Sequence, residues 1–314
     1  MNASRSHFDG LRTERARGTS FNESSARTRL ELLLDAGSFV EFLGPDKREV
    51  SPHLTIFDLP EQFDDGIVVG RGCLDATPVF VAAQEGRFMG GAFGEVHGAK
   101  VTGLLRAARE IKSMPVLMLL DTGGVRLQEA NAGELAIAEI MRAVVEARLA
   151  GVKVIGLIGG RSGCYGGGGL IAGCCSALAV SEPGRIAVSG PEVIETNRGV
   201  EEFDSRDRAM IWRTMGGKHR RLLGAADVFS DDNVQGFREA ALELLGWIGA
   251  FDLDKLMAEQ VRLADRLQSF GACQDAVEIW AARGASHPES IPDLPADQFI
   301  SLANKIGSTS RDAR

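Results

Sequence analysis

The chain has 314 residues, of which 44% are hydrophobic and 25% are charged, and its formal net charge is -8. A chain of this size and composition can bury a substantial core, as one large domain or two small ones. The acidic balance argues against non-specific nucleic-acid binding. No apolar stretch is both long enough and free enough of glycine to predict a membrane span, and the N-terminus lacks the apolar segment of a secretory signal, so we expect a cytoplasmic protein.

The cysteines predict reduced thiols and no metal site. The chain has five of them, Cys73, Cys164, Cys174, Cys175 and Cys273. An odd number without a Cys-x-x-Cys pair gives neither an even disulfide framework nor the spacing of a zinc site. We therefore expect no bound metal.

A capped helix and a hairpin are the first predicted elements. Residues 22–36 predict a helix that starts at Asn22 or Ser24 and ends before Gly37, and a short exposed strand should follow. Residues 66–85 give two strand-like runs joined by a turn near 75–78, as in a β-hairpin. From there on, predicted strands and helices alternate.

A unit of strand, glycine turn and helix is then predicted twice in succession. Apolar residues recur at helical spacing over 101–111, and "PVLMLLD" at 115–121 is a continuous apolar run typical of a strand buried on both faces. A glycine turn and a long helix over 134–151 follow this strand. The second unit combines the strand at 152–160, another glycine turn and a helix over 170–178.

The rest of the chain is predicted to be mainly helical. Pro191 suits the first turn of a helix. A further helix is expected from about 206 to 215, capped by Asp204 or Ser205, and helical patterns recur at 254–268 and 273–284. The basic cluster 218–221, "KHRR", predicts a solvated helix end, with contact to a phosphorylated ligand as the alternative.

The two glycine turns predict anion pockets made of backbone amides. Gly123 and Gly124 supply the first, and Gly166 and Gly167 supply the second. A helix that starts after such a turn presents unpaired N–H groups, and its dipole favours negative charge. No nucleophile elbow, zinc-binding helix or P-loop lysine accompanies them, so the donors suit a developing oxyanion such as a thioester enolate. The alternative is that the glycines only permit close helix packing.

A dinucleotide-binding fold is a second alternative. Gly160, Gly163 and Gly166 follow a strand, and Glu182 lies roughly where a ribose ligand would be expected. Their spacing is Gly-x-x-Gly-x-x-Gly, however, and a nicotinamide enzyme would not require the equivalent turn that precedes it.

Four segments resemble the carboxyltransferase family, whose members have a crotonase-type (ClpP-like) α/β fold and act on malonyl and acetyl thioesters. These are "FMGGAFGEVHGAKVTGLLRAA", "DTGGVRLQE", "CYGGGG" and "SEPGRIAVSGPEVIE". The longer strings "DTGGVRLQEAN" and "GVEEFDSRDRAMIWRTMGGKHR" resemble the branch formed by the β subunits of malonate decarboxylases. The zinc ribbon of the bacterial acetyl-CoA carboxylase β subunit is absent here, and Cys164 and Tyr165 stand where that subunit usually has two threonines.

The resemblance implies a subunit of a heteromeric enzyme. It implies a γ subunit of related fold, with the active site between the two chains. It also implies an acyl carrier protein with a CoA-like prosthetic arm, and an α subunit that acts as the acyl carrier protein transferase. A malonyl thioester would be converted to an acetyl thioester and CO₂, with no permanently bound cofactor. The alternatives are the carboxyltransferase subunit of a biotin-dependent malonate decarboxylase or acyl-CoA carboxylase, and a scaffold whose partner holds all the chemistry.

The resemblance also implies the roles of the site residues. The catalytic candidates are Gly123, Gly124, Val125, Gly166 and Gly167, and the substrate-binding candidates are Gly90, Gly91, Tyr165 and Gly168. Water, Tyr165, His97 or Glu129 could protonate the enolate carbon. For His97 the alternative is a loop histidine satisfied by backbone, and for Glu129 it is pairing near Arg126. We expect Cys164 to be inert.

Three regions are expected along the chain. Residues 1–25 are predicted to be an N-terminal leader, 26–245 a carboxyltransferase-like domain with the crotonase fold, and 246–314 a C-terminal helical region that serves packing or assembly.

Overall fold

The computed structural model describes residues 2–247 and 249–307, which contain a seven-stranded sheet. The strands lie in the order in which they occur along the chain. The first three are antiparallel, and β3 to β7 run parallel. The strands are β1 (Val40–Phe42), β2 (Ile67–Leu74), β3 (Thr77–Gln84), β4 (Val116–Leu120), β5 (Val154–Ile158), β6 (Ala177–Ser181) and β7 (Val228–Ser230).

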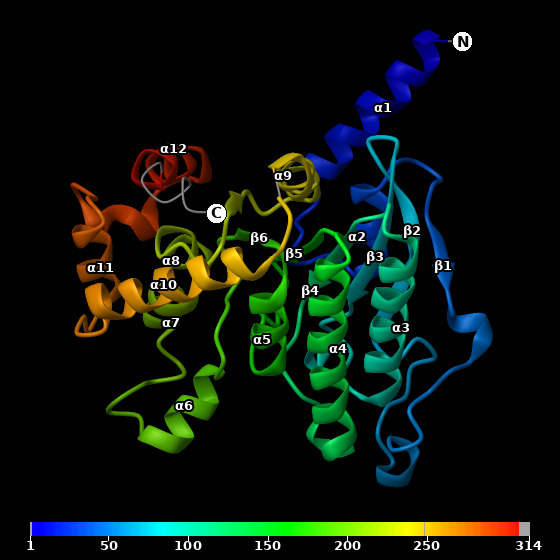
Figure 1. The fold of residues 1–314 in the computed structure, drawn as a ribbon, viewed down its shortest axis with the longest axis horizontal. Helices are drawn as coiled ribbons and strands as arrows, with labels where there is room; N and C mark the ends of the chain where they lie inside the picture. The colour runs from blue at the N-terminus through cyan, green and yellow to red at the C-terminus, as the bar shows by residue number, and fades with distance from the viewer. Residues whose placement is uncertain (1, 248, 308–314) are drawn as a thin grey trace.

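Helices cover both faces of this sheet (Figure 1). They are α1 (Asn2–Arg17), α2 (Ala26–Leu33), α3 (Glu95–Ile111), α4 (Asn131–Leu149), α5 (Gly167–Cys174), α6 (Pro191–Arg198), α7 (Arg208–Met215), α8 (Gly217–Leu222), α9 (Val234–Trp247), α10 (Leu253–Phe270), α11 (Ala276–Ala282) and α12 (Ala296–Gly307). None of the helices within the described ranges is long and apolar enough to cross a membrane.

Two hydrophobic cores lie on the two sides of the sheet. Side chains alternate along a strand, so Met118 of β4 packs with α3, α4 and α5, while its neighbour Leu117 packs with α2 and α9. The central strands β4, β5 and β6 are buried at every position. This double burial explains why β4 and β5 read as continuous apolar runs in the sequence. The predicted helix over 170–178 extends too far, because α5 ends at Cys174 and β6 begins at Ala177.

The predicted α/β alternation is confirmed, whereas the predicted helix caps are wrong by a few residues. Ser25 caps α2, because its side chain accepts from the amide of Thr28. Asp207 caps α7 in the same way, and Asp204 instead accepts from the amide of Arg206. Strand β7, of three residues, was not predicted.

The basic cluster 218–221 is not a solvated helix end. Lys218 is buried and donates to the carbonyl oxygens of Pro292 at 2.7 Å and Leu294 at 2.8 Å. His219 is also buried, and burial together with the neighbouring Arg220 lowers its pKa to about 3. Contacts with the distant C-terminal segment therefore bury a cluster that looks exposed from its local sequence.

The strand order does not fit a dinucleotide-binding fold. Such folds reverse their strand order at the ligand crevice. Here the order runs from β1 to β7 without reversal. Glu182 forms an ion pair with Lys218 at 2.9 Å, which accounts for this residue without a ribose ligand.

The two ends of the described chain pack against the sheet domain to different extents. At the N-terminal end, Phe21 stacks on Phe237 of α9 with ring centroids 3.9 Å apart. Trp280 of α11 and Phe299 of α12 are buried in the main core. Helix α10, which precedes α11 in the chain, has no buried side chain. The boundaries expected near 25 and 245 stay a prediction.

Candidate active site

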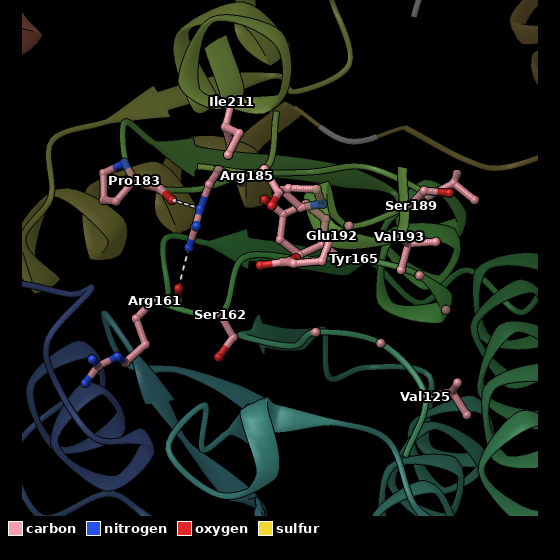
Figure 2. Close-up of a pocket in the computed structure, with 18 of the residues that line it drawn as sticks. Val125, Arg161, Ser162, Tyr165, Pro183, Arg185, Ser189, Glu192, Val193 and Ile211 are labelled. Carbon is pink, nitrogen blue, oxygen red and sulfur yellow. Dashed lines mark hydrogen bonds between the residues drawn. The ribbon is translucent and has the colours of Figure 1, made fainter. Parts of the chain in front are cut away.

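A cleft of about 1080 Å³ opens beyond the carboxyl ends of β4 and β5. Its walls come from the two glycine turns, from segment 183–193 and from α7 (Figure 2). Six of the nine predicted site residues line it: Gly123, Gly124, Val125, Tyr165, Gly166 and Gly167. Segments that are about forty residues apart in the sequence thus form one wall of the cleft.

The two glycine turns lie against each other. Thr122 pairs with both sides of the second turn, since its amide donates to Gly163 at 2.8 Å and its carbonyl accepts from Tyr165 at 3.0 Å. A methyl group added to Gly166 would lie 3.3 Å from the Cα of Gly124. Glycine at these positions therefore keeps the turns in contact and leaves their amides open to the cleft.

In the first turn one backbone amide is free to bind an oxyanion, whereas three were expected to do so. The Gly123 amide donates to the carbonyl of Gly90 at 2.8 Å, and the Gly124 amide donates to Oγ1 of Thr122 at 3.0 Å. The Val125 amide has no hydrogen-bond partner within the described part of the chain. Of the amides expected to bind an oxyanion here, that of Val125 is available.

The second turn offers two amides at the start of a helix. Gly166 has a φ of +57° and a ψ of -129°, and α5 begins at the next residue. Among residues 2–247 and 249–307, no acceptor pairs with the amides of Gly166 and Gly167, whereas the Gly168 amide donates to the Tyr165 carbonyl at 3.0 Å. Unpaired amides at a helix N-terminus attract negative charge.

Only the second of the two turns abuts a helix, which corrects the expectation that both do. After the first turn, residues 127–129 form a 3-10 helix and α4 begins at Asn131. The first turn is therefore not supported by a helix dipole. A buried arginine fixes it instead.

Arg126 anchors the first turn through buried ion pairs. Its Nη1 lies 2.9 Å from both Asp65 and Glu129, and its Nη2 donates to the Ala92 carbonyl at 3.0 Å. Burial raises the pKa of Asp65 despite the nearby guanidinium. Burial also opposes ionisation of Glu129, but hydrogen bonds from Ser51, from the Glu95 amide and from Arg126 lower its pKa overall. This network holds the amide of the adjacent residue, Val125.

The side chains considered as proton donors differ in where they lie. Tyr165 lines the cleft, its hydroxyl has no partner within the described residues, and burial raises its pKa. His97 lies in helix α3 and not in a loop, and burial and the charge of Arg126 lower its pKa to about 3. Glu129 is paired with Arg126, as expected from the sequence. Neither His97 nor Glu129 lines the cleft.

The other predicted residues support the turns without lining the cleft. The carbonyl oxygen of Gly90 accepts a hydrogen bond from the Gly123 amide. A methyl group on Gly91 would lie 1.8 Å from the carbonyl oxygen of Asp121. A methyl group on Gly168 would lie 2.3 Å from Cγ2 of Thr122. These three glycines do not line the cleft. Cys164 is fully buried, and burial raises the pKa of its thiol, which fits the prediction that it is inert.

The sequence did not single out Arg185, which the structure places in the cleft wall. The sequence feature that could have pointed to it is the segment "SEPGR", in which the arginine directly follows a tight Pro-Gly turn. The other arginines that line the cleft are Arg87, Arg161 and Arg208.

Comparison with known proteins defines the class. The carboxyl transferase domain family matches residues 14–242. This α/β chain belongs to the carboxyl transferase family, and its structural neighbours share the crotonase-type fold, which confirms the predicted fold class.

Individual relatives narrow the class. The chain is 37% identical over 311 residues to the malonyl-S-ACP:biotin-protein carboxyltransferase of Malonomonas rubra, covering 91% of this chain and 96% of the relative. It is 41% identical to a chain of the Pseudomonas malonate decarboxylase hetero-tetramer in complex with malonate, with a TM-score of 0.76, covering 84% of this chain and 96% of that one. A chain of the Pseudomonas MdcD-MdcE hetero-dimer gives 37% identity and a TM-score of 0.63, covering 79% and 97%.

Proposed function

We propose that this chain is the β subunit of a malonate decarboxylase, which decarboxylates a malonyl thioester on an acyl carrier protein. The observation that supports this most directly is that two glycine turns in one cleft present three amides without a hydrogen-bond partner among the described residues. The likeness to malonate decarboxylase chains over most of the sequence supports the same substrate class.

The amides stabilise charge that appears only as the reaction proceeds. When the bond between the carboxylate carbon and the α-carbon breaks, CO₂ leaves and the electron pair moves onto the thioester oxygen as an enolate. N–H groups aimed at that oxygen bind the enolate more strongly than the carbonyl, and each well-placed donor contributes about 3 to 4 kcal/mol. A proton then adds to the α-carbon to give the acetyl thioester.

We assign the two sets of amides to different groups of the substrate. The amide of Val125 binds the thioester oxygen, and the amides of Gly166 and Gly167 at the start of α5 bind the carboxylate that leaves as CO₂. Gly123, Gly124, Gly90, Gly91 and Gly168 keep the turns in shape. Tyr165 contacts the substrate from the cleft wall, and its hydroxyl or water supplies the proton.

The expected assembly follows from the same proposal. A γ subunit of related fold completes the active site, an acyl carrier protein delivers the malonyl group on its CoA-like arm, and an α subunit transfers the carrier protein. The relatives in a hetero-dimer and a hetero-tetramer support a heteromeric enzyme. The decarboxylase needs no resident cofactor in this proposal, and its cytoplasmic location stays a prediction.

A second candidate function transfers the carboxylate to biotin instead of releasing it. The Malonomonas rubra relative, a malonyl-S-ACP:biotin-protein carboxyltransferase, favours this alternative. The same cleft could form the enolate in both reactions. They differ in what accepts the carboxyl group.

The test is release of labelled CO₂ from carboxyl-labelled malonyl thioester by this chain co-purified with its candidate γ partner, with and without avidin. Release that avidin does not change supports the decarboxylase. Release that avidin abolishes assigns the chain to the biotin-dependent reaction. If the assembled pair releases no label and transfers none to biotin, both functions are wrong.

A further inference from the structure

Arg185 holds its guanidinium in the cleft in a fixed position. Nε donates to the Pro183 carbonyl at 3.2 Å, and Nη2 donates to the carbonyl of Arg161. Figure 2 shows both hydrogen bonds, which orient the side chain along the cleft wall. The guanidinium carbon also lies 5.1 Å from the ring centroid of Trp212 and 5.9 Å from that of Tyr165. Stacking on aromatic faces is a contact that arginine makes well.

This fixed cation has no counter-charge within the described residues. Arg185 forms no ion pair there, and Nη1 donates to no atom of residues 2–247 or 249–307. Its two hydrogen bonds go to carbonyl oxygens, which satisfy donors without neutralising the charge. Two carboxylates line the cleft, Glu23 and Glu192, and neither forms an ion pair with Arg185.

The other cleft cations are more exposed. Arg87 and Arg161 are exposed, and so is Arg208 at the start of α7. Arg185 is half-buried, and two carbonyls and two aromatic rings constrain it. A guanidinium immobilised before binding loses little conformational entropy when an anion arrives.

We propose that Arg185 is the anion anchor of this cleft and binds an oxyanion of the substrate through Nη1. On the proposed function, that oxyanion is either the carboxylate of the malonyl group or a phosphate of the CoA-like arm. Both accept hydrogen bonds from a guanidinium. The anchor would hold the substrate while the amides of the glycine turns bind the enolate.

The experiment separates these two sources with two substrates. Malonyl-CoA carries both the carboxylate and phosphates, whereas malonyl-N-acetylcysteamine carries the carboxylate alone. For Arg185→Met in the assembled enzyme we expect a loss of about 10- to 100-fold in kcat/KM, the size of a lost charge-assisted hydrogen bond. A loss with both substrates identifies the carboxylate, and a loss confined to KM for malonyl-CoA identifies a phosphate.

Two further variants guard against a purely structural effect. Arg185→Lys keeps the positive charge but lacks the planar guanidinium that stacks on the aromatic rings. It should recover part of the kcat/KM that Arg185→Met loses. Arg206→Met removes an exposed arginine outside the cleft and should leave both substrates unaffected. Thermal unfolding of each assembled variant shows whether it is folded.

Binding gives a readout that does not depend on turnover. Calorimetry with malonate and with inorganic pyrophosphate compares the wild type with Arg185→Met. If the wild type releases no CO₂ but binds one of these anions in an Arg185-dependent way, the proposed function fails while the anion anchor stands. If Arg185→Met is folded and changes neither kcat/KM nor anion binding, the anchor is wrong.

Discussion

Replacing Gly166 with alanine perturbs the second glycine turn with a single methyl group. Gly166 has a φ of +57° and a ψ of -129°, a conformation that alanine adopts only at a cost of about 1 to 3 kcal/mol. The added methyl would also lie 3.3 Å from the Cα of Gly124, so the two turns must separate slightly. Either response reorients the amides of Gly166 and Gly167.

The expected result is a loss of catalysis that exceeds the loss of stability. Displacing one oxyanion donor lowers kcat about 10²- to 10³-fold. The assay is kcat for CO₂ release by the assembled enzyme, with urea unfolding of each variant to measure stability. Gly173→Ala is the matched control, since Gly173 lies in the same helix α5 with open space around it. It should keep kcat and stabilise α5 by up to about 1 kcal/mol. A folded Gly166→Ala enzyme whose kcat stays within about threefold of the wild type would refute this reasoning.

Three further predictions concern the scaffold. Arg126→Met leaves two buried carboxylates without their cation and should lower the free energy of unfolding by about 3 to 5 kcal/mol in urea titrations; a change below about 1 kcal/mol would contradict the anchoring role. His97 has a folded pKa of about 3, below its unfolded value, so it stays neutral in the fold and its contribution to stability is lost as the pH falls below about 6.5. His97→Gln should therefore flatten the decline in unfolding free energy between pH 6.5 and 4.5. An unchanged slope would exclude His97 as a source of this pH dependence. Burial raises the thiol pKa of both Cys164 and Cys175, so mass spectrometry should find neither alkylated by iodoacetamide until the chain is denatured; rapid labelling of the native chain would show that they are accessible.

Periodicity predicted the framework because most of it is decided locally. Strands β4 and β5 are buried on both faces, and this makes them continuous apolar runs that the sequence displays directly. Helices α3 and α4 likewise carry their apolar residues on one face. The glycine turns were predicted to lie at strand ends, and the structure brings them together in one cleft.

The remaining features depend on contacts between distant residues. Nothing local indicates that the amide of Gly123 is paired with Gly90, so the sequence could not tell which amides stay free. The cluster at 218–221 looks exposed, but carbonyl groups near residue 292 bind Lys218. The guanidinium of Arg185 is held in the cleft by aromatic rings and carbonyls that only folding brings together.

The most direct test of the site is a crystal structure of the assembled enzyme with a malonyl thioester analogue that cannot lose CO₂. Our account predicts that the thioester oxygen lies about 2.7 to 3.1 Å from the amide of Val125, and that the carboxylate faces the amides of Gly166 and Gly167. A thioester bound entirely by the partner subunit, with these three amides facing water, would contradict it.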